Sequence, residues 1–259
     1  MQGSLTLKQT RSEMMPRIYL SPSTQENNLY VNGGTEEYYM NLLADALVPY
    51  LQSSGIQYTR NTPEMTAASS IRQANQGNYD FYLALHSNAA PEGSYGSKRG
   101  TDVYYYPGST RGQRAANIFV RNLKTIYPLP SLVRTVPTTS IGEVTKTRAP
   151  ANLIELAYHD NENDASWIKN NIPSIARNLA LSLTEYFGIP LVMPQPKQNG
   201  MVAITSGYLN IRSRPNMNAP VSGRAYNNNP IVILGSYQDW YVVDYNGVVG
   251  YANSRFIKI

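Results

Sequence analysis

The first 190 residues alternate short apolar runs with amphipathic helical patterns, and this alternation strongly limits the possible fold. The strand-like runs are Ile18 to Leu20, Phe81 to Leu85, Val103 to Tyr106 and Leu153 to Tyr158. Short apolar runs separated by helical segments are typical of a largely parallel sheet covered on both faces. The sequence therefore predicts an α/β domain with a mostly parallel sheet flanked by helices.

Two helices of this domain are predicted from apolar residues that recur every three or four positions. The first begins at Glu36 and ends before Gly55, which stands where a left-handed helix terminator belongs. The second begins just after Pro173, a favourable residue for a first helical turn, and ends before Gly188. This second helix is expected to close the domain.

The chain is predicted to divide into four parts. Residues 1–15 lack the apolar core of a signal peptide, and we interpret them as a leader or a remnant of an expression tag. Residues 16–191 form the α/β domain. Residues 192–200 contain two prolines and mostly polar residues, as linkers do. Residues 201–259 contain only short strand-like runs, with a strong hairpin signal at Asn246-Gly247.

Composition excludes several classes of protein. The chain has no cysteine, so disulfides and thiolate metal sites are excluded. No apolar run approaches the roughly 20 residues of a membrane span. The net charge of +5 is modest for a chain of this length. The lysines and arginines are scattered along the sequence, so no nucleic-acid-binding patch is evident.

The candidate site residues are few, because the chain has only two histidines. His86 ends a buried strand, where functional residues of parallel sheets gather, although a hydrogen-bonded core histidine fits equally well. Glu155 interrupts an apolar strand, where burial without a partner would be costly. Glu37 stands at a helix start, where the helix dipole favours carboxylates whatever their function. His159 follows the Glu155 strand and is either a ligand or a plain loop residue.

These segments, in this order, resemble the zinc-dependent N-acetylmuramoyl-L-alanine amidases of the amidase-3 type, over roughly residues 16–190. The family's Ser-Ile-His-Ala-Asn-Ala type motif is matched by Ala84-Leu85-His86-Ser87-Asn88-Ala89, and its late Val-Glu strand by Leu153-Ile154-Glu155. The resemblance implies a phosphorylase/hydrolase-like fold, a zinc cofactor and a peptidoglycan substrate. It also implies that Glu37 and His86 are metal ligands and that Glu155 is the catalytic base.

The chain departs from this family in its first loop. The family has Asp-Pro-Gly-His-Gly there, whereas this sequence has Ser21-Pro22-Ser23-Thr24-Gln25 and so lacks the first histidine ligand. We expect His159 to take the vacant role, which gives Glu37, His86 and His159 as the metal ligands, with Gln25 or Thr24 near the metal. The alternatives are a weakened site with Gln25 as a poor ligand, or no zinc and no catalysis. Asp160, Asn88 and Glu143 are candidates for holding the histidines in one tautomer.

The last segment resembles a bacterial SH3-type module. The matching residues are Leu209-Asn210-Ile211-Arg212-Ser213-Arg214-Pro215 and Trp240-Tyr241-Val242-Val243, with Arg214 in place of a glycine and Tyr251 in place of a tryptophan. Such a module implies attachment to the cell wall.

Together, the two resemblances imply hydrolysis of the amide between N-acetylmuramic acid and L-alanine by a monomer outside the cell or in the wall. Two alternatives remain: a catalytically inactive wall-binding or regulatory protein, and a zinc peptidase that cleaves stem peptides.

Overall fold

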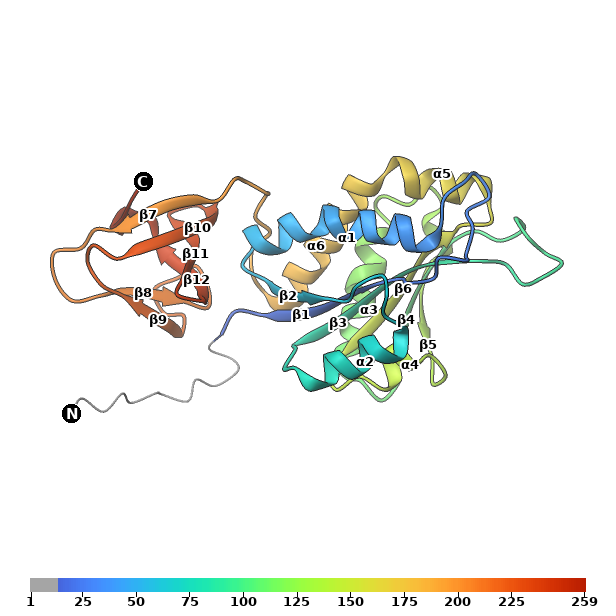
Figure 1. Ribbon diagram of the computed structural model, residues 1–259, viewed down its shortest axis with the longest axis horizontal. Coiled ribbons are helices and arrows are strands. Elements are labelled where there is room, and N and C mark those ends of the chain that lie inside the picture. The colour runs from blue at the N-terminus through green and yellow to red at the C-terminus, as the bar shows by residue number, and fades with distance from the viewer. Residues whose placement is uncertain (1–13) are drawn as a thin grey trace. The chain divides into compact units, whose positions relative to one another are not determined.

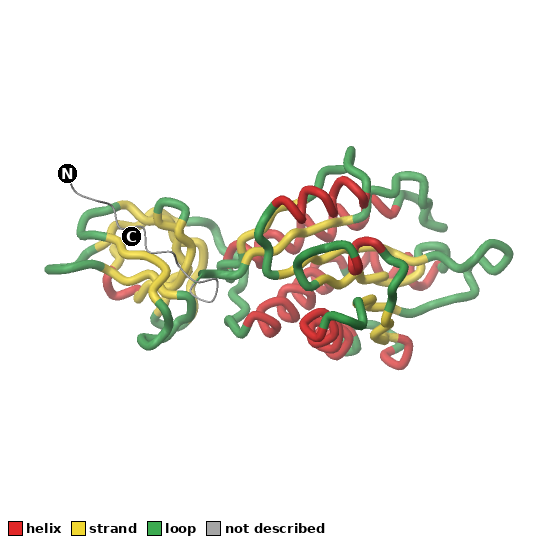
Figure 2. The backbone as a smooth tube through the Cα atoms, turned by 90° about the horizontal axis from the view of Figure 1, so that it is seen from below, coloured by secondary structure: helices red, strands yellow, loops and turns green. Residues whose placement is uncertain are grey.

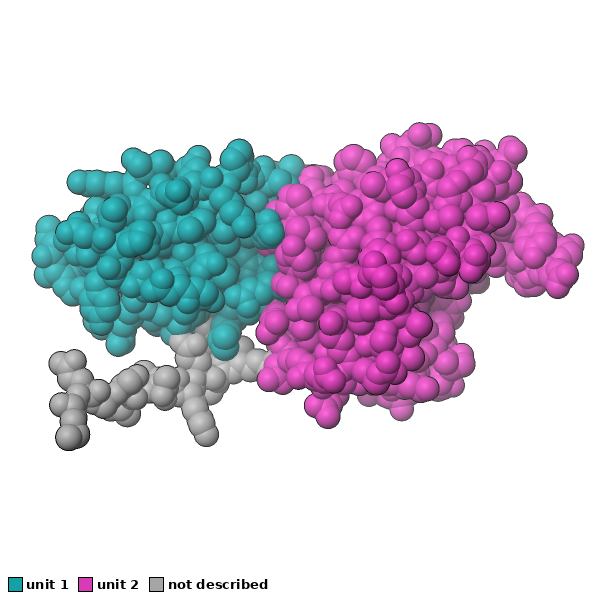
Figure 3. Space-filling model, viewed as in Figure 1, with its two compact units in different colours: residues 1–16, 52–57, 192–259 teal, residues 17–51, 58–191 magenta. Residues whose placement is uncertain are grey.

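The computed structural model describes residues 14–259, and these form two compact units. Unit 1 comprises the described residues 14–16, 52–57 and 192–259, and unit 2 comprises residues 17–51 and 58–191 (Figure 3). The prediction for residues 1–15 lies almost wholly outside the described residues. No helix among residues 14–259 has the length and apolar character needed to cross a bilayer.

Unit 2 is built on a six-stranded mixed sheet in the order β2-β1-β3-β6-β4-β5 (Figure 1). Its strands are β1 (Arg17–Pro22), β2 (Gln57–Arg60), β3 (Phe81–Asn88), β4 (Thr101–Tyr105), β5 (Val133–Pro137) and β6 (Ala151–Tyr158). β1 runs parallel to β3, β3 to β6 and β4 to β5, while β4 and β6 are antiparallel. The predicted α/β class is confirmed.

Helices cover both faces of this sheet. They are α1 (Glu36–Ser53), α2 (Ala67–Gln76), α3 (Thr110–Leu123), α4 (Gly142–Thr145), α5 (Glu162–Asn170) and α6 (Ile172–Phe187), with a short 3-10 turn η2 (Pro130–Leu132). The predicted terminator at Gly55 is confirmed, since its φ is +78°.

Strand alternation decides which residues face which helices. Phe81 of β3 packs against Phe119 of α3 and Tyr186 of α6, on one face of the sheet. Tyr82 and Ala84 share a buried cluster with residues of α2 and α4, on the other face. His86 follows Tyr82 and Ala84 at intervals of two residues along β3. Its side chain therefore points to the same face of the sheet, the one that α2 and α4 cover.

Unit 1 consists almost entirely of strands and loops (Figure 2). Its seven-stranded antiparallel sheet has the order β13-β7-β10-β11-β12-β8-β9. The strands are β7 (Gln198–Val202), β8 (Leu209–Arg212), β9 (Val221–Ala225), β10 (Pro230–Tyr237), β11 (Trp240–Tyr245), β12 (Val248–Asn253) and β13 (Ile257–Lys258), with a 3-10 turn η3 (Ser254–Phe256). Strand β7 begins inside the segment predicted as a linker.

The predicted hairpin at Asn246-Gly247 is confirmed. It joins β11 to β12, and Tyr245 pairs with Val248 across the turn. Both central residues have positive φ, 52° and 82°, as a type I′ turn requires. The alternating residues of the strands enclose an apolar core that includes Val202, Ile211, Ile233 and Val243.

Candidate active site

The candidate site lies in unit 2, at the carboxyl ends of the neighbouring parallel strands β1, β3 and β6. His86 stands near the end of β3, and its Cα partner in the parallel ladder is Glu155 of β6. The loop after β1 brings Gln25 to the same place. The first residue of α1, Glu36, and a residue of α4, Glu143, complete the group. Five segments of the chain thus supply the site: β3, β6, the loop after β1, α1 and α4.

The ring of His86 is held between two carboxylates. Its Nδ1 lies 2.9 Å from Oε1 of Glu36, and its Nε2 lies 3.0 Å from Oε2 of Glu143. All three residues are buried. With both ring nitrogens engaged, the orientation of the imidazole is fixed.

A polar group from the β1 loop joins the Nδ1 side of the ring. Nε2 of Gln25 lies 3.3 Å from Nδ1 of His86. Asn28 donates through Nδ2 to Oε1 of Gln25 at 3.1 Å and to Oε2 of Glu36 at 2.6 Å. Gln25 and Glu36 therefore occupy one side of His86 and are tied together by Asn28.

Glu143 is itself anchored by the sheet. Its Oε1 accepts hydrogen bonds from Oγ of Ser21 at 2.9 Å and from the hydroxyl of Tyr82 at 2.7 Å. Both oxygens of this buried carboxylate are thus satisfied, one by the sheet and one by His86. An anchored carboxylate behind a histidine selects the ring tautomer that carries hydrogen on Nε2.

Glu155 has a different environment. Its Oε2 is buried and has no hydrogen-bond partner among the described residues. The side chain lines a cavity of about 540 Å³ together with His86, Gln25 and Glu143. A carboxylate that lines a cavity and has an oxygen without a hydrogen-bond partner can accept a proton from a molecule bound there.

The electrostatics separate the acids into two kinds. Burial raises the pKa of Glu155 to about 7, against an opposing effect of His86. Burial would also raise the pKa of Glu36 and Glu143, but the hydrogen bond and charge of His86 outweigh it, so both pKa values lie below the usual 4.5. Burial disfavours the charged form of His86, yet Glu143 and Glu36 raise its pKa well above 6.5. Without a metal, His86 is an imidazolium between two carboxylates.

The structure brings Glu36, rather than the predicted Glu37, to His86. Glu36 is 1% exposed, whereas Glu37 is only partly buried and lines a separate hollow beside Glu26 and Glu64. The helix pattern holds a signal for this choice, because the buried stripe of α1 runs through Met40 and, four residues earlier, reaches Glu36.

The structure does not bring His159 to the ring of His86. Its Nδ1 lies 2.9 Å from the carbonyl oxygen of Ser87 and 3.1 Å from Oγ of Ser87, and its ring stacks on Tyr30 at 5.4 Å between centroids. His159 is absent from the lining of the cavity that contains His86 and Glu155. In this arrangement His159 holds Ser87, the residue of β3 that follows His86, through hydrogen bonds.

The other polar candidates have separate places. Asp160 accepts backbone hydrogen bonds from Ala90 and Gly96 and so holds the loop after β3. Asn88 caps the backbone amide of Ala89. Of the three candidates, Glu143 is the one whose side chain contacts a histidine ring, whereas Asn88 contacts His159 through the backbone alone.

A metal held here would need a mixed set of ligands. Among residues 14–259, no group of three or more His, Asp or Glu side chains has the arrangement of a metal site. His86 and Glu36 supply one imidazole nitrogen and one carboxylate. The side-chain amide of Gln25 lies on the same side of the ring, with Nε2 toward Nδ1 of His86 and Oε1 toward Asn28, and a rotation of this amide would offer its oxygen as a third donor. Nitrogen and oxygen donors of this kind suit zinc. The residues therefore fit a three-ligand site in which one ligand is neutral and weak.

Glu155 can accept a proton, and it lies beside the pair formed by His86 and Glu36 at the carboxyl ends of the strands. Such an arrangement is typical of the active site of a hydrolase. Comparison with protein families agrees. Residues 23–185 match the family described as N-acetylmuramoyl-L-alanine amidase, and residues 207–258 match the bacterial SH3 domain. The chain belongs to the N-acetylmuramoyl-L-alanine amidase family and carries a bacterial SH3 domain after its catalytic unit.

Solved structures share the fold of unit 2 at low sequence identity. The amidase AmiC2 of Nostoc punctiforme is 15% identical with a TM-score of 0.58, and the alignment covers 67% of this chain and 97% of that one. The catalytic domain of the CD27L endolysin, which targets Clostridia difficile, is 20% identical with a TM-score of 0.54, covering 66% and 97%. The catalytic domain of CwlV from Bacillus (Paenibacillus) polymyxa is 14% identical with a TM-score of 0.58, covering 68% and 100%. A comparison with curated protein sequences gives no significant match.

Proposed function

We propose that this chain hydrolyses the amide between N-acetylmuramic acid and L-alanine in peptidoglycan, outside the cell or in the wall. The observation that carries the proposal is the pairing of His86 with Glu155 across β3 and β6 within one cavity. Family membership supports the substrate, and the SH3 domain supports attachment to the same polymer.

The proposed cofactor is zinc, held by Nδ1 of His86, the carboxylate of Glu36 and the side-chain oxygen of Gln25. A bound zinc ion would polarise the scissile carbonyl and lower the pKa of a bound water. In this assignment Gln25 takes the place of the loop histidine that the chain lacks. His159 stays in its contacts with Ser87 and Tyr30.

The chain's own residues supply the proton transfers. Glu155 lines the cavity, has one oxygen without a hydrogen-bond partner and has a pKa of about 7, so it can accept a proton from water and return it to the leaving nitrogen. Glu143 accepts hydrogen from Nε2 of His86 and keeps Nδ1 directed toward Glu36 and Gln25. Asn28 orients both of those side chains.

One observation favours a second candidate function, a wall-binding protein without catalysis. The third ligand in this assignment, the side chain of Gln25, is a neutral amide, which binds zinc less strongly than imidazole or carboxylate. If the amide oxygen of Gln25 holds zinc too weakly, the imidazolium between two carboxylates is the resting state of the protein.

The deciding experiment compares two adjacent glutamates. Zinc content and release of intact stem peptides from purified peptidoglycan are measured for the unmodified chain, Glu36→Gln and Glu37→Gln. We expect Glu36→Gln to lose zinc and hydrolysis and the matched control Glu37→Gln to keep both. Mass spectrometry of the products separates an amidase, which leaves every peptide bond intact, from a stem-peptide peptidase. Absence of zinc and cleavage in the unmodified chain would favour the inactive wall-binding protein.

A further inference from the structure

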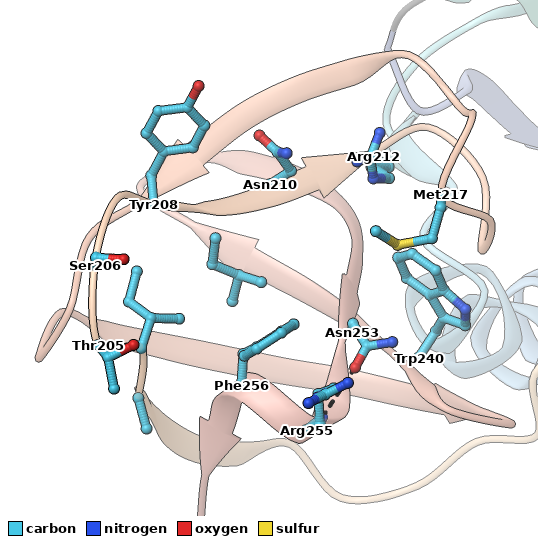
Figure 4. Close-up of a pocket in the computed structure, with 13 residues that line it drawn as sticks. Thr205, Ser206, Tyr208, Asn210, Arg212, Met217, Trp240, Asn253, Arg255 and Phe256 are labelled. Carbon is cyan, nitrogen blue, oxygen red and sulfur yellow. Dashed lines mark hydrogen bonds between the residues drawn. The ribbon is translucent and has the colours of Figure 1, made fainter.

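Unit 1 contains a pocket of about 470 Å³ that the chemistry of unit 2 does not use (Figure 4). Its walls come from the segment before β8, from β8 itself, and from the β12 end with η3. Figure 4 shows Met217 and Trp240 at one end and Thr205, Ser206 and Tyr208 at the other, with Phe256 between them. The volume is in the range of pockets that hold small ligands.

Strand alternation places two polar side chains in this pocket. Leu209 and Ile211 of β8 point into the core and are buried, so Asn210 and Arg212 share the opposite face. Both line the pocket. The sequence of β8 therefore presents an amide and a guanidinium side by side.

The charge of the pocket is of one sign. Arg212 and Arg255 line it, and no aspartate or glutamate does. Arg212 donates Nη1 to the carbonyl of Ala219 at 2.8 Å, and the guanidinium of Arg255 stacks on Phe256 at 5.0 Å. Within residues 14–259, neither arginine forms an ion pair with a carboxylate of the chain itself. Two guanidinium groups are thus available to an anionic ligand.

The amide of Asn210 adds an independent indication of a ligand. Its Oδ1 is buried and has no hydrogen-bond partner within the described part of the chain. A buried acceptor without a partner is costly, and a donor on a ligand would satisfy it. A backbone N–H of a peptide is such a donor.

Aromatic and thioether groups complete the pocket. Tyr208 is 44% exposed and Met217 is 64% exposed, while Trp240, at the Met217 end of the pocket, is almost fully buried. Such surfaces pack against aliphatic parts of a ligand. A ligand with carboxylates, backbone amides and small aliphatic groups would match all three features.

We propose that this pocket binds carboxylate-bearing peptide, with Arg212 and Arg255 as its carboxylate receptors. The assignment rests on the proposed function for the source of the peptide, which is the stem peptide of the wall polymer. Guanidinium groups bind carboxylates in paired, charge-assisted hydrogen bonds. A neutral glycan would stack on the aromatic rings but would leave both guanidinium groups unused. Because the proposed hydrolysis leaves every peptide bond intact, the ligand of unit 1 would survive the reaction of unit 2.

The test measures binding of the full chain carrying Glu155→Gln, so that the ligand is not consumed. The probe is the disaccharide-peptide fraction released from peptidoglycan by a muramidase, titrated by calorimetry. We expect Arg212→Gln and Arg255→Gln each to weaken binding to unit 1 about tenfold or more, and the double variant to abolish that binding event while leaving any binding to the cavity of unit 2. The matched control is Lys258→Gln, which removes the same charge from an exposed residue outside the pocket and should leave binding unchanged.

Three further probes identify the ligand chemistry. The same fraction with its carboxylates converted to amides should lose binding, and chitotetraose should not compete. A glycerol phosphate polymer tests phosphate as the anion. Equal binding of the amidated fraction, competition by chitotetraose, tighter binding of the phosphate polymer, or full binding by the double arginine variant would each overturn the proposal.

Failure of this proposal can be distinguished from failure of the proposed function. With Glu155 intact, the double arginine variant should cleave a soluble muramoyl-L-alanine substrate as fast as the unmodified chain. Loss of hydrolysis with retained arginine-dependent binding would refute only the proposed activity. Circular dichroism of each variant verifies that unit 1 is folded.

Discussion

His86 and Glu155 occupy the same register position on two adjacent parallel strands, so the imidazole and the carboxylate face the same cavity. The relationship is set by the sheet, because both strands are buried on both faces and cannot slip by one residue without exposing their apolar side chains. The separation of base and imidazole is thereby fixed before any ligand binds.

Replacing Glu155 by Gln should abolish catalysis without unfolding the chain. The amide keeps the shape of the side chain but cannot accept the water proton, so we expect hydrolysis to fall about 100- to 10,000-fold. The melting temperature should stay equal or rise, because the substitution removes an acid that has a buried oxygen without a hydrogen-bond partner. Release of new amino groups from peptidoglycan gives the rate, and retained activity would exclude Glu155 as the base.

Glu143 should act through His86 rather than on the substrate. Glu143→Gln keeps the size of the side chain but no longer fixes the charge behind Nε2 of His86, so we expect zinc affinity to fall about 10- to 100-fold. Competition with a chelator measures this affinity directly. Glu162→Gln, an exposed acid at the start of α5, serves as the control. Unchanged affinity in Glu143→Gln would leave Glu143 a purely structural acid.

The sequence predicted the sheet, the principal helices and the hairpin well, because these depend on local periodicity and turn residues. It predicted His86 as a site residue because His86 ends an apolar strand, and Glu155 because Glu155 interrupts one. The choice between Glu36 and Glu37 depends on the rotation of α1, and adjacent helical positions point about 100° apart. The contact of Glu143 with His86 spans 57 residues and no local pattern encodes it.

Asp164 should be a major determinant of the stability of unit 2. It is fully buried and accepts hydrogen bonds from Nε of Arg99 at 2.8 Å, the hydroxyl of Tyr127 at 2.7 Å and the backbone of Gly100 and Tyr158. Asp164→Ala would leave these buried donors without an acceptor.

We expect this substitution to cost about 3–5 kcal/mol of the free energy of unfolding, measured by denaturant titration. The control removes an acid from an exposed ion pair. Asp45 pairs with Arg60 but its side chain is 64% exposed, so Asp45→Ala should cost less than about 1 kcal/mol. Similar losses in the two variants would contradict the role assigned to Asp164.

The metal-free chain should be most stable in mildly acidic solution. Glu36 and Glu143 have lowered pKa values, so the stability they contribute is present above about 4.5 and is lost as the pH falls through their folded pKa values. His86 has a raised pKa, so its contribution is complete below 6.5 and is lost as the pH rises through its higher folded value. The pKa of Glu155 is raised to about 7. Between pH 4.5 and 7 this carboxyl is therefore ionised in the unfolded chain but largely protonated in the folded one, so Glu155 also makes the folded chain less stable as the pH rises.

Melting temperatures of the chelated chain from pH 3 to 9 test this expectation. They should pass through a maximum between about 4.5 and 6.5, and His86→Ala should flatten the decline on the alkaline side. Added zinc should stabilise more as the pH rises, since coordination requires neutral imidazole. A maximum above pH 8 in the metal-free chain would contradict the paired state of His86.

Either Gln25 or His159 could be the third metal ligand, and substitutions at these two positions distinguish the two assignments. If Gln25 is that ligand, Gln25→Ala should lose most bound zinc. Gln25→His should bind zinc more tightly than the unmodified chain, because imidazole is a better zinc ligand than a neutral amide oxygen. His159→Ala should retain zinc but lower the melting temperature, because Ser87 loses a buried hydrogen-bond partner and Tyr30 loses its stacked ring. Loss of zinc in His159→Ala with a normal melting temperature would instead make His159 the ligand, and would require the loop after β6 to move from its contacts with Ser87 when the metal binds.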